Sequence, residues 1–198
     1  MTDYDALLKI CEARKSTRVF DSAPVHGDMI EKIRKIALTS PYASGRKNWE
    51  VKVITDRDLL RSMARVVEEK TRAIQERIRP DMQEHFASYA RNFSFFASAP
   101  ALFVTTFRAA PSLSLMLPEP GPDIIQWERD ASVKSISCVA MLILLAAESL
   151  GLGGCYVTGA LIAEEELARL LDIPKGRNIG ALIPVGFPAK RINQEENT

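Results

Sequence analysis

A short stretch near the start of the chain brings together three cations and a hydroxyl. Arg14, Lys15 and Arg18 lie around Ser16. Guanidinium groups bind phosphate in bidentate fashion, and a hydroxyl between them can contribute a further hydrogen bond. An apolar helical pattern over residues 4–11 ends just before the cluster, so the cations lie where the chain leaves a helix. The stretch predicts a site for a phosphorylated ligand, and a merely solvated basic surface is the alternative.

This stretch is also a motif. The order Arg, basic, Ser, any, Arg, any, Phe over residues 14–20 resembles the opening motif of the nitroreductase family of FMN-dependent oxidoreductases. Residues 40–49 resemble a second family stretch, which reads roughly Ser-Pro-Ser-x-x-Asn-x-Gln-Pro-Trp before a strand. Ser40, Pro41 and Trp49 fall in register with it without a gap.

Two later segments match the same family. Residues 144–159 resemble its long apolar helix, the Gly-Leu-Gly exit of that helix and the strand end that faces the flavin. Residues 183–188 resemble its last strand with a Gly-aromatic-Pro ending. The resemblance implies an α+β fold with a mixed central sheet flanked by helices. It also implies an intertwined homodimer with one FMN at each subunit interface.

The resemblance assigns roles to the basic cluster. Arg14 and Ser16 are expected to serve the phosphate and the ribityl chain of FMN, and Lys15 is expected to contribute at least its backbone. Arg18 is expected near the pyrimidine edge of the ring, where a cation stabilises the negative charge of reduced flavin.

Further flavin contacts follow from the other matches. Thr158 and Gly159 match the position whose backbone approaches flavin N5, and Gly159 is expected to allow that close approach. The positions that match those presented to the flavin of the opposite subunit are Pro41, Tyr42, Ala43 and Gly45. Lys190 or Arg191 is expected to supply countercharge to the phosphate, and the sequence does not choose between the two.

The second motif also departs from the family. Tyr42 replaces the usual Ser, Gly45 replaces Asn, Lys47 replaces Gln and Asn48 replaces Pro. The loss of the Asn and Gln side chains removes amide donors from the region that recognises flavin or substrate, while Lys47 adds a cation. We expect FMN binding to survive these changes, whereas a preference for nitroaromatic substrates does not follow.

The chain shows no acid, base or nucleophile set of its own. The glycines at 151, 153 and 154 follow a predicted helix and lead into a predicted strand. In a dinucleotide-binding motif the glycines follow a strand and lead into a helix, so this motif is not expected here. Glu164 to Glu166 lie at a helix start, where carboxylates complement the helix dipole. The cofactor is therefore expected to carry the chemistry, with no catalytic side chain. We predict an oxidoreductase that passes electrons from NAD(P)H through flavin N5 to a nitro compound, quinone or enone by a ping-pong mechanism.

Two other classes of function remain open at this point. The protein could bind FMN and act as a flavin carrier or a flavin-fragmenting protein with little NAD(P)H turnover. It could also be a cofactor-free binding protein that keeps the fold, in which case the cations of the cluster lie on an ordinary surface.

Bulk properties narrow the remaining classes. The chain has 198 residues, a formal net charge of +1 and two histidines. We expect one domain over residues 1–198, and no partnership with nucleic acid, which needs a basic surface. The three cysteines and two histidines form no metal-ligand spacing, so no metal site is expected. The first residues lack a signal peptide, and the uncharged runs, 135–147 among them, are too short to span a bilayer, which predicts a cytoplasmic protein without a membrane partner.

Periodicity and breakers place the elements around these motifs. Helices are expected over 28–37, from 57 to the proline at 80, over 82–92, over 123–150 and over 164–171. Strands are expected over 50–54, 101–107, 155–157 and 179–187. Residues 111–122 hold four prolines and one glycine, and are expected to form a loop that lines the substrate region.

Overall fold

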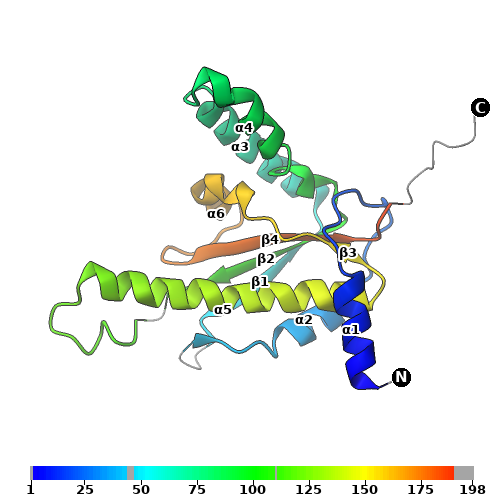
Figure 1. The fold of residues 1–198 in the computed structure, drawn as a ribbon, viewed down its shortest axis with the longest axis horizontal. Coiled ribbons are helices and arrows are strands. Elements are labelled where there is room, and N and C mark those ends of the chain that lie inside the picture. Colours follow the sequence, from blue (N-terminus) through cyan, green and yellow to red (C-terminus); the bar gives the residue numbers. More distant parts are fainter. Residues whose placement is uncertain (1, 44–46, 110, 190–198) are drawn as a thin grey trace, which may run out of the picture.

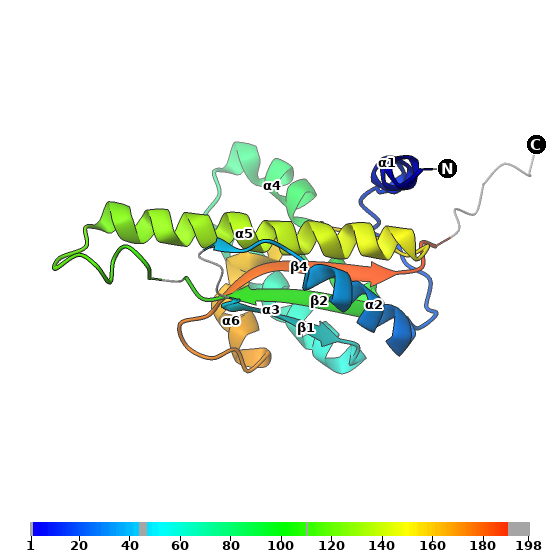
Figure 2. The ribbon, with the colours of Figure 1, turned by 90° about the horizontal axis from the view of Figure 1, so that it is seen from below.

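A central sheet lies between two layers of helices (Figures 1 and 2). The structure is a computed structural model that describes residues 2–43, 47–109 and 111–189. Its helices are α1 (Asp3–Ala13), α2 (Gly27–Ala37), α3 (Arg57–Gln75), α4 (Gln83–Ala90), α5 (Pro122–Ser149) and α6 (Glu164–Leu170). Its strands are β1 (Trp49–Ile54), β2 (Ala101–Phe107), β3 (Gly153–Gly154) and β4 (Asn178–Gly186). Short 3₁₀ turns cover Pro80–Met82, Phe95–Ser98 and Gly159–Ala163.

The four strands are arranged in the order β1-β2-β4-β3, and each neighbouring pair is antiparallel. A parallel component enters through one isolated bridge, between Ser16 and Gly154. The predicted α+β class is confirmed, and the predicted mixed sheet is reduced to this single parallel bridge among the described residues.

Each face of the sheet packs on its own apolar core. One core joins the sheet to α2 and α5, with Phe103 and Ile183 from the strands and Ile143 from α5 fully buried. The other core joins it to α3 and α6, with Leu102 and Leu182 facing that way. Successive residues of a strand point to opposite faces, so the two cores share β2 and β4. Because both faces are covered, β2 is buried along its whole length, which explains why its sequence is nearly all apolar.

The long helix α5 crosses the sheet beside α2 and ends near β3 and α1 (Figure 1). Its end is fixed by Gly151, whose φ is +75°, a conformation that glycine adopts without strain. The Leu152 N–H then bonds the Ala147 carbonyl at 2.9 Å and the Gly151 N–H bonds that of Glu148 at 3.0 Å. This pattern ends the helix and turns the chain directly into β3, so the glycine predicted to end the helix does so.

By length and composition, α5 is the one helix in the described part of the chain that could cross a membrane, with a mean hydropathy of 1.7 in its most apolar window. Here it serves as a core helix, because Ile136, Val139 and Ile143 are buried against the sheet and α2.

The strand after α5 differs from the prediction. It was expected over residues 155–157, and the structure places β3 at Gly153–Gly154 instead. Val157 pairs with Leu182 only as an isolated bridge. The two glycines pair with β4 because they lack side chains: a Cβ on Gly153 would lie 2.3 Å from Thr17 Oγ1, and one on Gly154 would lie 3.3 Å from the Pro184 carbonyl. Apolar patterning cannot signal a strand made of glycine.

We predict that Gly153→Ala destabilises the protein, because the added methyl would overlap the buried Thr17 side chain. Overpacking of this kind costs about 1–3 kcal/mol, which urea unfolding measures directly. Gly27→Ala is the matched control, since a Cβ there meets nothing within 4 Å and Gly27 begins α2. Equal stability of the two variants would show that the contact between Thr17 and β3 is not tight.

Candidate functional site

The basic cluster forms an extended segment that is attached to the sheet. The Thr17 N–H donates to the Gly154 carbonyl at 3.0 Å, and the Asp21 N–H donates to the Phe187 carbonyl at 2.8 Å. Thr17 is buried, with 8% of its surface exposed, while Ser16 and Arg18 are exposed. Side chains alternate along extended chain, so Thr17 points to the sheet and Arg14, Ser16 and Arg18 share the opposite face.

Two cavities lie along this face. One, of about 380 Å³, is lined by Arg14 and Ser16 together with Met141, Leu144 and Tyr156. The other, of about 140 Å³, is lined by Arg18, Tyr89, Asn92, Phe93, Phe95 and the run Cys155–Gly159. Tyr156 lines both cavities. The structure therefore brings five predicted residues to two adjoining cavities, namely Arg14, Ser16, Arg18, Thr158 and Gly159.

The cations on this face are available to an anion. Within the described residues, Arg14 and Arg18 form no ion pair and no side-chain hydrogen bond. The first cavity combines that charge with the apolar Met141 and Leu144. Lys15 is exposed and lines neither cavity, and its expected backbone contact with FMN stays a prediction. This lining fits a ligand that carries an anionic group beside an apolar part.

Gly159 is small for a reason that the sequence did not reveal. A Cβ there would lie 2.2 Å from Cδ1 of Phe93. Phe93 is 5% exposed and packs edge-on against Tyr89, with ring centroids 4.9 Å apart. The expected close approach of a flavin to Gly159 stays a prediction, but packing against Phe93 already requires the absence of a side chain.

The predicted residues from the second motif lie elsewhere in the chain. Pro41 is exposed, while Tyr42 and Ala43 are half-buried, and the Ala43 N–H donates to Ser135 Oγ of α5 at 3.0 Å. Tyr42 packs near Trp49, and burial raises the pKa of its hydroxyl. None of the three lines the two cavities of the same subunit. Their predicted contact with the flavin of an opposite subunit stays a prediction.

Three other predicted residues, Gly45, Lys190 and Arg191, fall outside the described residues. Ala189 is the last residue described, and its N–H donates to the Val19 carbonyl at 3.1 Å. The chain therefore reaches residue 189 beside the basic cluster.

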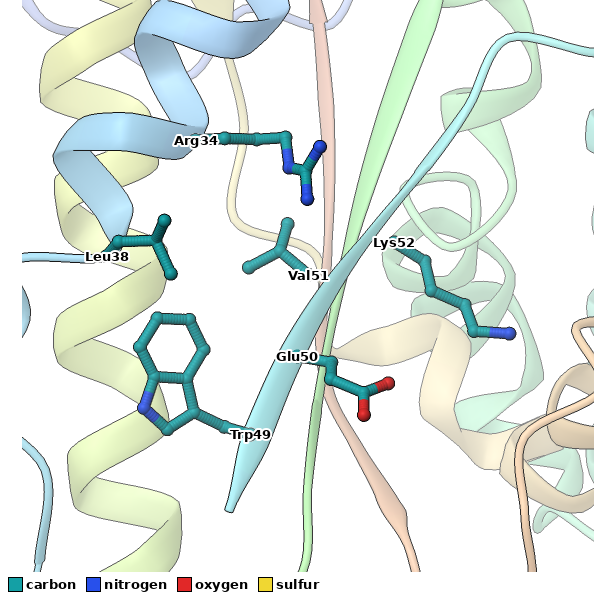
Figure 3. A pocket seen from close by; sticks show the side chains of 6 residues that line it. All are labelled: Arg34, Leu38, Trp49, Glu50, Val51 and Lys52. Carbon is teal, nitrogen blue, oxygen red and sulfur yellow. The ribbon is translucent and has the colours of Figure 1, made fainter. Parts of the chain in front are cut away.

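A third cavity, of about 350 Å³, lies at the opposite edge of the sheet, between α2 and β1 (Figure 3). Arg34, Leu38 and Trp49 border it, while Glu50 and Lys52 extend to the other side of β1. Its charges are engaged within the chain: Arg34 pairs with Glu31, Glu50 with Arg177, and Lys52 Nζ donates to the Leu171 carbonyl. No predicted site residue borders this cavity.

The loop before α5 is held by one carboxylate. Glu128 is 7% exposed, and its Oε1 accepts from the N–H groups of Ser112 at 2.6 Å and Ser114 at 3.0 Å. Its Oε2 accepts from Ser114 Oγ at 2.7 Å. Hydrogen bonds from Ser114, and then from Ser112, lower the pKa of Glu128 to about 2. The predicted loop exists, and its conformation is fixed by an anchor on α5 that the sequence pattern did not reveal.

Sequence reasoning also missed several residues that line the cavities. Tyr89 lies in the last turn of α4 and Asn92 just after that helix, where an irregular pattern gave no sign of a site. Tyr156 lay within a matched motif, two residues before Thr158 and therefore on the same face of an extended chain. That spacing was the signal available for it.

Comparison with known proteins gives the family. The model of the nitroreductase family matches residues 11–187. The chain belongs to the nitroreductase family. The sequence-based assignment to this family is confirmed, together with its fold.

The relatives within the family differ in their described activities. An iodotyrosine deiodinase of Nematostella vectensis is 29% identical over 187 residues, which cover 92% of this chain and 67% of that protein. A proposed NADH dehydrogenase/NAD(P)H nitroreductase of Archaeoglobus fulgidus is 26% identical, over 91% of this chain and 84% of that protein.

Solved structures agree with the fold. A BluB-like flavoprotein of Clostridium difficile superposes with a TM-score of 0.83 at 24% identity, covering 97% of this chain and 94% of that one. A nitroreductase with bound FMN from Desulfitobacterium hafniense superposes with a TM-score of 0.70 at 19% identity, covering 100% and 98%.

We predict that Gly159→Ala destabilises the protein without any ligand, by about 1–3 kcal/mol, because the methyl overlaps the Phe93 ring. Phe93→Leu replaces that ring with a smaller side chain, so Gly159→Ala should destabilise the protein less in the Phe93→Leu background. Thermal or urea unfolding of the four proteins gives the coupling free energy. An equal cost in both backgrounds would contradict this account of Gly159.

We predict that the amide signals of Ser112 and Ser114 titrate with a midpoint near pH 2 in the wild type. Because the pKa of Glu128 is lower in the folded protein, its hydrogen bonds stabilise the loop above about pH 4.5 and are lost as the pH falls toward 2. At pH 7, Glu128→Ala should abolish amide protection in this loop, while Glu119→Ala, at an exposed carboxylate of the same loop, should leave it unchanged. A midpoint near 4.5 would show that Glu128 does not hold the loop.

Proposed function

We propose that this protein is an FMN-dependent oxidoreductase that takes electrons from a reduced nicotinamide and passes them to a small organic acceptor. When bound, FMN supplies the hydride and electron chemistry for which the chain has no side chains of its own. The observation that carries the proposal is the row Arg14, Ser16 and Arg18, held on the sheet by Thr17 and facing two adjoining cavities. FMN-bound and flavin-containing relatives of the same fold support the cofactor.

The proposed roles follow from position and charge. Arg14 and Ser16 hold the phosphate end, because they combine a guanidinium and a hydroxyl in one cavity. Arg18 offers positive charge to the ring end, where charge increases on reduction. Phe93, Phe95 and Tyr89 give the second cavity aromatic walls, which suit a planar ring.

A second copy of the chain is part of this proposal. No residue of α1 is buried within the single chain. Its apolar side chains include Tyr4, which is 70% exposed, and Leu7, which is 55% exposed. Met141, on the adjoining part of α5, is 49% exposed. These exposed apolar side chains support a subunit interface beside the first cavity. We propose a homodimer in the cytoplasm, in which Pro41, Tyr42 and Ala43 of one subunit face the flavin of the other.

A second candidate acceptor is an aryl halide. It is favoured by the relative from Nematostella vectensis, whose described activity is the deiodination of iodotyrosine. Release of iodide from iodotyrosine by the reduced protein would support this candidate, and oxidation of the reduced protein by quinones or nitroarenes alone would oppose it.

We predict that Arg14→Ala weakens FMN binding by about 1.5–3 kcal/mol, or roughly 10- to 150-fold in Kd, the usual range for hydrogen bonds to a charged group. Lys15→Ala is the matched control and should change Kd little, because the Lys15 side chain lines neither cavity. Fluorescence quenching of FMN measures both constants. NADH oxidation at limiting FMN should fall in Arg14→Ala and recover at saturating FMN. Equal Kd values for Arg14→Ala and the wild type would remove Arg14 from the phosphate site.

A further inference from the structure

Tyr156 separates the two cavities of the site. It lies in the run Cys155–Gly159, where Cys155 and Val157 are each 4% exposed and Tyr156 is 39% exposed. The Val157 N–H donates to the Leu182 carbonyl at 2.9 Å, so the alternation is fixed by β4. Tyr156 and Thr158 consequently share the outward face, and the phenol ring borders both cavities.

The parallel bridge between Ser16 and Gly154 orders the residues along the site. Because the two segments run in the same direction there, the row Arg14, Ser16, Arg18 and the row Gly154, Tyr156, Thr158 advance together. Arg14 and Ser16 border only the first cavity, and Arg18 and Thr158 border only the second. Tyr156 borders both cavities and therefore lies between the two ends.

The hydrogen bonds of Tyr156 determine what it can offer to a ligand. Ser137 Oγ donates its single hydrogen to the Val133 carbonyl at 2.9 Å. Ser137 can therefore only accept from Tyr156 Oη, which lies 3.3 Å away. The phenolic hydrogen is directed to α5, and the lone pairs of Tyr156 Oη remain for a donor in the cavity.

The geometry points to Tyr156 as the residue that binds the ribityl chain of FMN, accepting a hydrogen bond from one of its hydroxyl groups. This inference rests on the proposed function. In FMN the ribityl chain joins the phosphate to the ring, so it is the part that must pass between the two cavities. The ribityl hydroxyls can donate a hydrogen bond to Tyr156 Oη, whose own hydrogen is directed to Ser137. Ser137 is then a positioning residue that orients Tyr156.

Three flavins that differ by one part each test the assignment. Lumiflavin has the ring alone, riboflavin adds the ribityl chain, and FMN adds the phosphate. Tyr156→Phe keeps the aromatic ring of the side chain and removes the acceptor oxygen. It should therefore raise the Kd of riboflavin and of FMN by the same factor, about 2- to 12-fold, and leave the Kd of lumiflavin unchanged. Tyr89→Phe is the matched control, because Tyr89 borders only the second cavity, and it should not alter the ratio of riboflavin to lumiflavin affinity.

The outcomes separate this inference from the proposed function. If Tyr156→Phe weakens the binding of lumiflavin and of riboflavin by the same factor, the Tyr156 hydroxyl contacts the flavin ring, and the inference is overturned. Unchanged affinity for all three flavins would also overturn it, while FMN binding by the wild type would leave the proposed function standing. If the wild-type protein binds none of the three, the proposed function itself fails. Circular dichroism of Tyr156→Phe checks that the fold is kept.

Discussion

The fit of Thr17 against β3 is the constraint on which the rest of the site depends. A buried threonine lies where Gly153 has no side chain, and its N–H bonds the Gly154 carbonyl at 3.0 Å. This contact fixes the face that the chain after α1 turns to the sheet. Because side chains alternate, the same contact directs Arg14, Ser16 and Arg18 outward together. Loss of the tight fit would therefore disturb all three at once.

The other side of the site is built by the same sheet. The end of α5 at Gly151 brings the chain to β3, and the bond from Val157 to Leu182 fixes the following residues. Phe93 fills the space beside Gly159, so the second cavity has a firm aromatic wall before any ligand enters. A site formed from such packed elements is preorganised, which lowers the entropic cost of binding a flexible cofactor.

The sequence predicted most of the fold because long periodic segments carry a strong signal. The helix expected over 123–150 is α5, and the strand expected over 101–107 is β2. It predicted β3 wrongly because two glycines have no pattern to read, and it extended the helix after Asp56 to Pro80, whereas α3 ends at Gln75. Two of the matched motifs correctly indicated five residues that line the cavities. Tertiary contacts such as the packing of Phe93 on Gly159, and the anchoring of the loop by Glu128, depend on distant segments and could not be predicted from local patterns.

The most direct measurement of the central claim is the visible absorption spectrum of the FMN-reconstituted protein, recorded without oxygen before and after addition of NADH. The account predicts that FMN stays with the protein through gel filtration and that its oxidised band bleaches on addition of NADH and returns with an organic acceptor. A colourless protein after reconstitution, or a bound flavin that neither NADH nor NADPH reduces, would contradict it.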